Sequence, residues 1–297
     1  MMSYQKLSPA WQSWIQENIA RGCDVESLAQ AMLQQNFTRN EALGAITHFS
    51  GNPNKLSRAT DLSHASENPD DEQAYANTAP IFTSQDSALQ IAEHVVQVRV
   101  RFARPRVIVF DNVITAPECD ELMRLSKVKL SRSTIVDPLT GREEIIQDRS
   151  SSGTFFNLNE NAFIASLDQR ISRLMNLPIE NGEGLQILNY QVGGEYKPHF
   201  DFFPPQDAGS AHHLSMGGQR VSTLVIYLNE PVQGGETSFP EVGLSVVPKK
   251  GSAVYFEYTN QQGQVDRLSL HAGEPVRSGE KWIATKWMRQ GKYAKAN

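Results

Sequence analysis

His199 and Asp201 are separated by one residue in the stretch Tyr196-Lys197-Pro198-His199-Phe200-Asp201. Successive side chains of an extended strand alternate between its two faces, so this imidazole and this carboxylate would lie side by side. His271, 70 residues after Asp201, offers a second imidazole. Two histidines and one carboxylate make up the facial triad of non-haem Fe(II) sites, which leaves coordination positions open for other ligands. The spacing therefore predicts that these three residues bind one metal ion.

Lys281 is a second chemical signal, near the end of the chain. In a strand over residues 281–288, Lys281 would lie on one face and Lys286 on the other. An ammonium group on an otherwise apolar face is costly unless it meets an anion, and a bound dicarboxylate would supply one. The residues expected to share the face of Lys281 are Ile283, Thr285 and Trp287.

A His-x-Asp pair also occurs by chance, and a lone histidine is more often an ordinary surface or core residue than a ligand. Here, further motifs between about Arg106 and about Arg289 match those of a known family in order and spacing. The chain resembles the prolyl 4-hydroxylase family of Fe(II)/2-oxoglutarate dioxygenases in Tyr190, His199-Phe200-Asp201, Gly234-Gly235-Glu236-Thr237-Ser238-Phe239-Pro240, His271, Lys281-Trp282 and Thr285-Lys286-Trp287.

This resemblance implies a metal and a cosubstrate. His199, Asp201 and His271 would hold Fe(II), and 2-oxoglutarate would chelate that metal. Lys281 would pair with the far carboxylate of 2-oxoglutarate, because an unpaired buried charge is costly. These four residues are the ones expected to carry the catalytic chemistry.

Five further positions match the family with less specificity. Tyr190 and Thr237 resemble hydroxyl donors to the cosubstrate, although a core tyrosine and a plain strand threonine would look the same. Tyr196, Arg220 and Trp287 match positions that contact the peptide substrate or order the site. For these three, aromatic residues of a barrel wall and an arginine that pairs with an acid are the alternatives.

The implied reaction is the hydroxylation of a peptidyl proline, coupled to the conversion of 2-oxoglutarate and O2 to succinate and CO2. Ascorbate is expected to support it by rescuing oxidised iron. The same chemistry on a lysyl residue or a free amino acid is the nearest alternative. A non-catalytic binding module is the other, and the intact set of metal ligands argues against it.

The sequence pattern predicts an α+β fold for the elements that position these residues. From residue 185 onward, short extended segments are broken by Gly and Pro, which together with the triad favours a double-stranded β-helix, a jelly-roll-like barrel. Before it we expect a helix over residues 87–98, a strand at 107–110, a helix capped by Thr115 and an amphipathic helix over 161–176. The first part of residues 129–157, with Asp137-Pro138 and Thr140-Gly141, reads as a hairpin or mobile loop, either at the mouth of the site or simply on the surface. The second part, Arg149 to Phe156, resembles the family's strand beside the peptide-binding groove. In the loop over 205–218, His212 and His213 are expected at the solvent or the rim rather than on the metal.

Three regions follow from these patterns. Residues 1–50 read as a small accessory module of three helices, either a docking element or a ubiquitin-associated-like interaction domain with a protein partner. Residues 51–86 read as a flexible linker, since large apolar residues are scarce there. Residues 87–297 would form the dioxygenase domain, with its core over 185–290.

Composition narrows the class of protein. The chain has 297 residues, 39% of them hydrophobic, and a net charge of −5, which gives no sign of nucleic-acid binding. Its two cysteines, Cys23 and Cys119, are too few for a disulfide framework or a zinc site and suit a reducing cytoplasm. We find no apolar run long enough for a membrane span and no signal peptide at the N-terminus.

Overall fold

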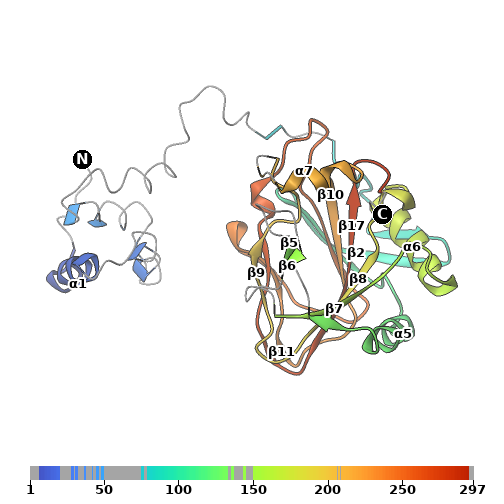
Figure 1. The fold of residues 1–297 in the computed structure, drawn as a ribbon, viewed down its shortest axis with the longest axis horizontal. Helices are drawn as coiled ribbons and strands as arrows, with labels where there is room; N and C mark the ends of the chain where they lie inside the picture. Colours follow the sequence, from blue (N-terminus) through green and yellow to red (C-terminus); the bar gives the residue numbers. More distant parts are fainter. Residues whose placement is uncertain are drawn as a thin grey trace. The chain divides into compact units, whose positions relative to one another are not determined.

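The computed structural model describes residues 7–20, separate positions between 28 and 49, and residues 75–76, 79–132, 135–136, 143–144, 150–205, 207 and 209–293. The chain divides into two compact units, Met1–Ala74 and Tyr75–Asn297 (Figure 1). The second unit thus begins before the predicted residue 87. Residues 51–74 of the predicted linker lie outside the described residues.

The first unit contains α1 (Pro9–Ala20), which matches the first predicted helix. The other two predicted helices fall largely outside the described residues. Trp11 packs edge-on against Trp14 and Phe37, with ring centroids 5.1 and 5.0 Å away. A small apolar core lies beside them, made of Ile15, Leu28, Ala29, Met32, Ala42, Ala45 and Ile46.

The second unit is built on a major sheet of nine antiparallel strands. Its order is β1-β2-β3-β14-β10-β17-β8-β7-β4. The strands are β1 (Ala88–Ile91), β2 (His94–Phe102), β3 (Arg106–Asp111), β4 (Ser131–Arg132), β7 (Ser152–Phe156), β8 (Leu185–Tyr190), β10 (Arg220–Tyr227), β14 (Ala253–Glu257) and β17 (Lys281–Arg289).

The helix expected over residues 87–98 is wrong: β1 and β2 form a hairpin there, in which Ile91 pairs with His94. Ala92, at φ 54°, takes the left-handed conformation that this tight turn needs. Val96 is fully buried in the core, and β2 pairs with β3 on its other side. Pairing with two neighbouring strands and the β-branched valines therefore outweigh any local helical preference.

A minor sheet of four strands packs against the major one. Its order is β13-β12-β15-β9, made of β9 (Tyr196–His199), β12 (Thr237–Phe239), β13 (Leu244–Val246) and β15 (His271–Gly273). Tyr227 and Ile283 of the major sheet share one apolar cluster with Phe239 and Val246 of the minor sheet. This packing of two antiparallel sheets fits the expected jelly-roll-like core. Two short pairs complete the strands, β11 (Gln233–Gly234) with β16 (Val276–Ser278) and β5 (Ile135–Val136) with β6 (Glu143–Glu144).

The opposite face of the major sheet is covered by α5 (Ala116–Lys127) and α6 (Ala162–Met175), as Figure 1 shows. Thr115 caps α5 as predicted: its hydroxyl accepts from the Glu118 backbone N–H, and the Glu118 carboxylate accepts from the Thr115 N–H. Arg170 of α6 then pairs with Glu118 at 2.8 Å and ties the two helices together. The predicted helix over 161–176 is confirmed.

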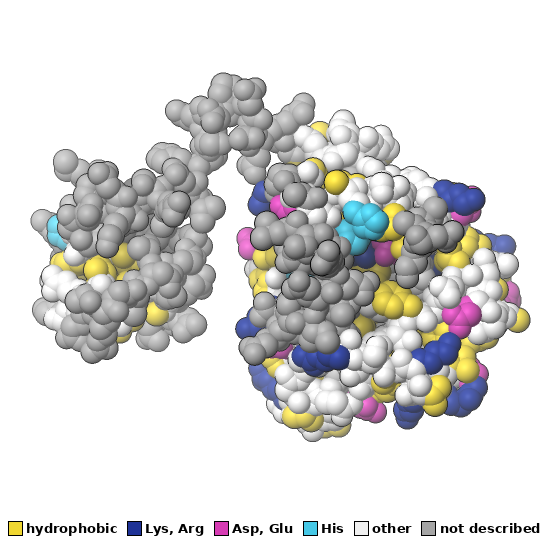
Figure 2. Space-filling model, viewed as in Figure 1, with side chains coloured by type: hydrophobic (Ala, Val, Ile, Leu, Met, Phe, Trp, Pro, Cys, Tyr) yellow, Lys and Arg dark blue, Asp and Glu magenta, His cyan; other side chains and the backbone are white. Residues whose placement is uncertain are grey.

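Shorter helices lie in the connections. They are α7 (Ser210–Ser215), η3 (Ile179–Asn181), η4 (Pro240–Val242) and η5 (Arg267–Ser269). The segment over 205–218, expected to be a loop, therefore contains a short helix that carries His212 and His213. No helix in the described part of the chain has both the length and the apolar character that crossing a membrane requires. On the face shown in Figure 2, the described acidic and basic side chains of the second unit are interspersed.

Candidate active site

The three predicted metal ligands converge where the minor sheet meets the chain leaving β9. His199 on β9 and His271 on β15 are direct partners in the antiparallel pair. Asp201 follows two residues later, and its two carboxylate oxygens lie 3.7 Å from His199 Nε2 and 3.6 Å from His271 Nε2. All the potential ligand atoms lie within 4.8 Å of one another. This spacing suits a single metal ion held by two nitrogens and one oxygen.

The backbone orients both imidazoles for this role. His199 Nδ1 lies 2.8 Å from the carbonyl oxygen of Lys197, and His271 Nδ1 lies 3.0 Å from that of Ser269. A carbonyl only accepts hydrogen bonds, so each Nδ1 carries a hydrogen, which leaves each Nε2 as the nitrogen that can bind a metal ion. Both Nε2 atoms thus lie on the side of Asp201, where one metal ion could bind all three residues.

Asp201 is held in its ionised form. Burial alone would raise the pKa of this carboxyl group, but His271, His199 and Arg220, with a hydrogen bond from Thr223, lower it below its ordinary value. The Thr223 hydroxyl donates to Asp201 Oδ2 at 2.7 Å and lies 3.0 Å from the hydroxyl of Tyr258. The structure therefore supplies an anionic oxygen ligand with a fixed orientation.

A cavity opens beside this triad, lined by both sheets. One row of alternate residues on β17 forms part of its wall, namely Lys281, Ile283, Thr285 and Trp287. The predicted face of this strand is thus confirmed. Lys286 lies on the opposite face, where it pairs with Asp168 at 2.8 Å.

Lys281 brings a buried positive charge into the cavity wall. It is 2% exposed, and no carboxylate among the described residues forms an ion pair with it. Its ammonium nitrogen lies 5.6 Å from the ring centroid of Tyr190 and 6.0 Å from that of Tyr227. Burial lowers the pKa of Lys281 to about 8, against the opposing effect of Glu236 and Glu274. Such a group suits the carboxylate of a bound ligand.

The two predicted hydroxyl donors also line this cavity, and Tyr227 brings a third hydroxyl beside Thr237. Tyr190 is the direct partner of Lys281 across β8 and β17. Thr237 accepts a hydrogen bond from the hydroxyl of Tyr227 at 2.8 Å. Sequence reasoning missed Tyr227, although strand alternation from Thr223 through Val225 would have placed it on the inward face of β10. The hydrogen bond of Tyr227 with Thr237 depends on how the minor sheet packs on the major one, which no local pattern predicts.

Two of the three candidate substrate residues border the cavity. Tyr196 stacks on the ring of His199, with centroids 3.5 Å apart. Trp287 is 8% exposed, and its indole N–H has no hydrogen-bond acceptor among the described residues. A buried donor without a partner at a cavity wall suits an acceptor on a bound molecule.

Arg220 is placed differently. It does not line the cavity but pairs with Glu183 at 2.7 Å, and its guanidinium lies 4.1 Å from the ring centroid of Trp287. Its Nη1 donates to the backbone carbonyl of Asp201 at 3.2 Å. The structure therefore matches the alternative in which this arginine pairs with an acid. Arg220 also packs against the ring of Trp287.

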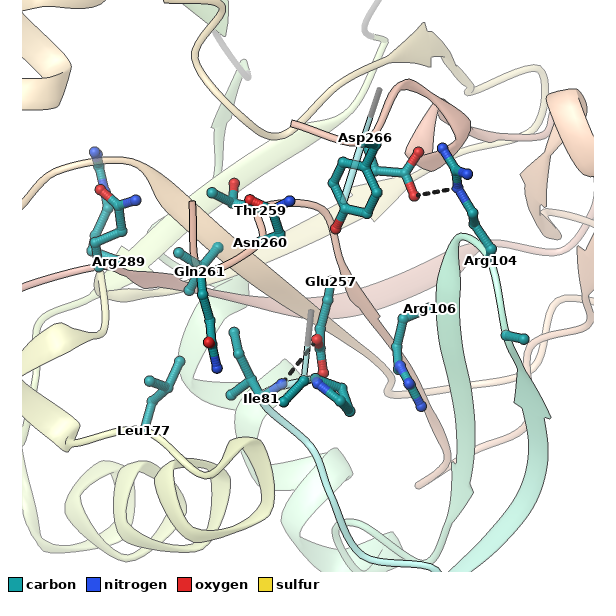
Figure 3. Close-up of a pocket in the computed structure, with 16 residues that line it drawn as sticks. Ile81, Arg104, Arg106, Leu177, Glu257, Thr259, Asn260, Gln261, Asp266 and Arg289 are labelled. Carbon is teal, nitrogen blue, oxygen red and sulfur yellow. Dashed lines mark hydrogen bonds and ion pairs between the residues drawn. The ribbon is translucent and has the colours of Figure 1, made fainter. Parts of the chain in front are cut away.

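A second cavity, of about 280 Å³, lies away from the triad (Figure 3). Glu257 accepts from the backbone N–H groups of Ile81 and Phe82 at 3.0 and 2.9 Å. Arg104 lies 3.6 Å from the carboxylate of Asp266. Both carboxylates are thus engaged within the protein, and none of the three metal ligands borders this cavity.

Comparison with known proteins gives a family match, several relatives and several solved structures. The sequence profile of the 2OG-Fe(II) oxygenase superfamily matches residues 185–289. Prolyl 4-hydroxylase 5 of Arabidopsis thaliana is 39% identical over 202 residues, which cover 62% of this chain and 68% of that protein. Prolyl 4-hydroxylase 1 of the same plant is 40% identical over 201 residues, 63% of this chain and 69% of that protein. A solved structure of the viral collagen prolyl hydroxylase of Paramecium Bursaria Chlorella virus-1 with 2OG is 28% identical, covers 61% of this chain and 94% of that one, and has a TM-score of 0.48.

Proposed function

This chain belongs to the prolyl 4-hydroxylase family of Fe(II)/2-oxoglutarate-dependent dioxygenases, and on that premise we propose that it hydroxylates a proline residue within a peptide or protein. One observation carries the proposal. Two imidazoles and a carboxylate that suit Fe(II) lie in the same cavity as a buried ammonium group with no carboxylate partner among the described residues. The cavity therefore offers one group of residues for the metal and a separate positive charge for the dicarboxylate.

The chain's own residues would divide the work as follows. His199, Asp201 and His271 would hold Fe(II), and Lys281 would bind the far carboxylate of 2-oxoglutarate, with Thr237 in the same cavity wall. When bound, iron and 2-oxoglutarate supply the oxidation: one oxygen atom of O2 enters the substrate C–H bond and the other enters succinate, as CO2 is released. The protein orients the substrate and excludes bulk water from the site.

The substrate would reach the cavity past Tyr196 and Trp287. The indole N–H of Trp287 is placed to donate to a peptide carbonyl, which would orient the residue to be hydroxylated. The ring of Tyr196 covers one face of the His199 imidazole and would shape the space beside the metal. Arg220 would act indirectly, through its stacking on Trp287.

The direct test is to incubate the purified protein with Fe(II), 2-oxoglutarate, ascorbate and a set of proline-containing peptides. We expect succinate to form together with a peptide that gains one oxygen atom on proline. His199→Ala is the matched control, because it removes one metal ligand and should abolish both products. Succinate formation that depends on lysine peptides or on a free amino acid, with every proline peptide unchanged, would contradict the proline assignment.

Three finer points are part of the same proposal. Ascorbate would keep the iron in its reduced form. A reducing cytoplasm would suit the chain, since Cys119 is buried and unpaired. Residues 1–50 would form an accessory module that binds a protein partner. The linker would end before Tyr75, and the second unit, Tyr75–Asn297, would be the catalytic domain. Cross-linking in cells of the full chain and of a variant without residues 1–50 would test the partner, which should be captured only by the full chain.

A further inference from the structure

The chain makes an excursion directly after the metal ligand Asp201 and comes back at Arg220, the first residue of β10. We call residues 202–219 the returning segment; the structure describes all of it except residues 206 and 208. Its two ends are fastened to each other. The Gln219 side chain donates to the Phe203 carbonyl at 2.6 Å and accepts from the Phe203 N–H at 2.8 Å.

The middle of the returning segment is held by Arg289, the last residue of β17. Its Nη1 donates to the backbone carbonyls of His213 at 2.9 Å and Gly218 at 2.8 Å. The guanidinium also lies 4.7 Å from the ring centroid of Phe203, whose ring is stacked on His213 at 5.0 Å. With 1% of its surface exposed, Arg289 thus fixes the returning segment to the strand that lines the metal cavity.

Glu183 joins Arg289 to the metal site. Its Oε1 accepts from Arg289 Nε at 2.6 Å and from Arg220 Nε at 2.7 Å, while Oε2 accepts from Arg220 Nη2 at 2.9 Å. Arg220 in turn donates to the backbone carbonyl of Asp201 and stacks on Trp287. One connected network therefore reaches from the returning segment to a metal ligand and to the cavity wall.

The charges in this network are unbalanced. Two guanidinium groups share one carboxylate. The side chains of Glu183 and Arg289 are buried, and that of Arg220 is 16% exposed. Such buried ionic groups add little net stability, because desolvation offsets their attraction. Glu183 is already bound at both oxygens by Arg220, so charge pairing alone does not require Arg289. The distinctive contacts of Arg289 are its bonds to the two carbonyls of the returning segment.

We propose that Arg289 is a positioning residue: by holding the returning segment, it keeps Arg220, the Asp201 backbone and Trp287 in the arrangement that presents the target C–H bond to the metal. Arg289 does not line the cavity of the metal ligands, so its effect should appear on the peptide. The kinetic part of this inference rests on the proposed function. The part that concerns the order of the returning segment does not.

The test compares Arg289→Met with Lys286→Met, measured by hydrogen exchange over residues 202–219 in the full chain. Lys286 is a matched control, because it is a buried, ion-paired cation on the same strand that faces away from the cavity. We expect Arg289→Met to speed exchange in the returning segment by about tenfold, the size expected from losing a charge-assisted hydrogen bond. Lys286→Met should leave exchange there unchanged.

The same two variants are then compared in turnover. Arg289→Met should raise KM for the peptide by about tenfold and lower the ratio of hydroxylated peptide to succinate, while KM for 2-oxoglutarate stays within about twofold. Lys286→Met should leave that ratio unchanged, whatever it does to the melting temperature. Unchanged exchange in Arg289→Met, or an equal fall of the ratio in both variants, would overturn the positioning role. If the unsubstituted protein hydroxylates no proline peptide, the proposed function fails, and hydrogen exchange alone decides whether Arg289 holds the segment.

Discussion

At the residue scale, the protonation state of Lys281 depends strongly on its surroundings. It is buried without a carboxylate partner among the described residues, and burial lowers its pKa to about 8. Without a ligand, the ammonium form is therefore lost at a pH where an exposed lysine would still be charged. A dicarboxylate that binds to this group should favour the protonated form in return.

This gives a pH dependence for the cosubstrate. Below pH 8 Lys281 is protonated and can bind a carboxylate, so KM for 2-oxoglutarate should be lowest there and rise as the pH passes through about 8. The check is KM for 2-oxoglutarate measured at several pH values on both sides of that point. Lys281→Arg stays charged throughout, so any binding it retains should lack this rise. The idea is wrong if both proteins show the same profile.

The same shift affects stability in the apo protein. The folded pKa of Lys281 lies below its ordinary value, so between the two values the unfolded chain binds more protons than the folded one. The free energy of unfolding should therefore increase as the pH rises from about 8 to about 10, so that the protein becomes more stable. Urea unfolding of the unsubstituted protein and of Lys281→Met across that range isolates this contribution, which the Met variant should lack.

Thr223 is the second residue with a defined task, since its hydroxyl donates to the ligand oxygen of Asp201. Thr223→Val should weaken Fe(II) binding by about 10- to 100-fold, as loss of a hydrogen bond to a metal ligand does. Thr223→Ser keeps the hydroxyl and should bind iron normally. Metal titration of the apo proteins measures both, and equal affinity of the Val and Ser variants would count against this task.

At the element scale, β17 combines the functions of the fold. Its inward row lines the cavity from Lys281 to Trp287, its outward Lys286 anchors α6 through Asp168, and its last residue holds the returning segment. It lies between β10 and β8 in the major sheet, so neither of its edges is free. A strand paired on both sides is a rigid support for a site.

The turn at Gly235 tests how closely this support is packed. Gly235 has φ 76°, and a Cβ there would lie 3.1 Å from Lys281 Cδ. Gly235→Ala should cost about 1 kcal/mol of stability from backbone strain and also raise KM for 2-oxoglutarate by displacing Lys281. Gly243→Ala, at φ 64° with no atom within 4 Å of the added Cβ, should show the strain alone. Chemical denaturation and cosubstrate kinetics on both variants separate the two effects.

At the scale of the whole molecule, the second unit is a self-contained body that starts at Tyr75. The Ala76 N–H donates to Gln264 Oε1 at 2.8 Å. Phe82 is buried, and its ring centroid lies 5.4 Å from that of Phe110. Glu257 receives the backbone N–H groups of Ile81 and Phe82. The residues before β1 therefore belong to the fold of the second unit.

Two truncations follow from this boundary. A chain of residues 75–297 should bind Fe(II) and 2-oxoglutarate as the full chain does. A chain of residues 87–297 loses Phe82 and leaves Glu257 without its backbone donors, and should be less stable by about 3 kcal/mol or more. Urea unfolding of the two chains gives the difference, and equal stability would show that these contacts contribute little.

The sequence by itself determined the features that depend on local period and residue type. The His-x-Asp spacing placed His199 and Asp201 together, strand alternation placed Lys281 and Trp287 on one face, and the capping signal at Thr115 located α5. The predictions for Lys281, Trp287 and Thr115 held because a strand's alternation and a helix's first turn depend on a few neighbouring residues. His199 and Asp201 lie together although Asp201 follows the end of β9, because only one residue separates them.

Only the tertiary structure decided which distant groups meet. Residues 88–102 became a hairpin because β3 offered a strand to pair with, Arg220 turned to Glu183 instead of lining the cavity, and Tyr227 found the hydroxyl of Thr237. Each of these outcomes depends on a partner far away along the chain or on another strand. Long-range pairing is set by the packing of the whole sheet, which no local pattern in the sequence records.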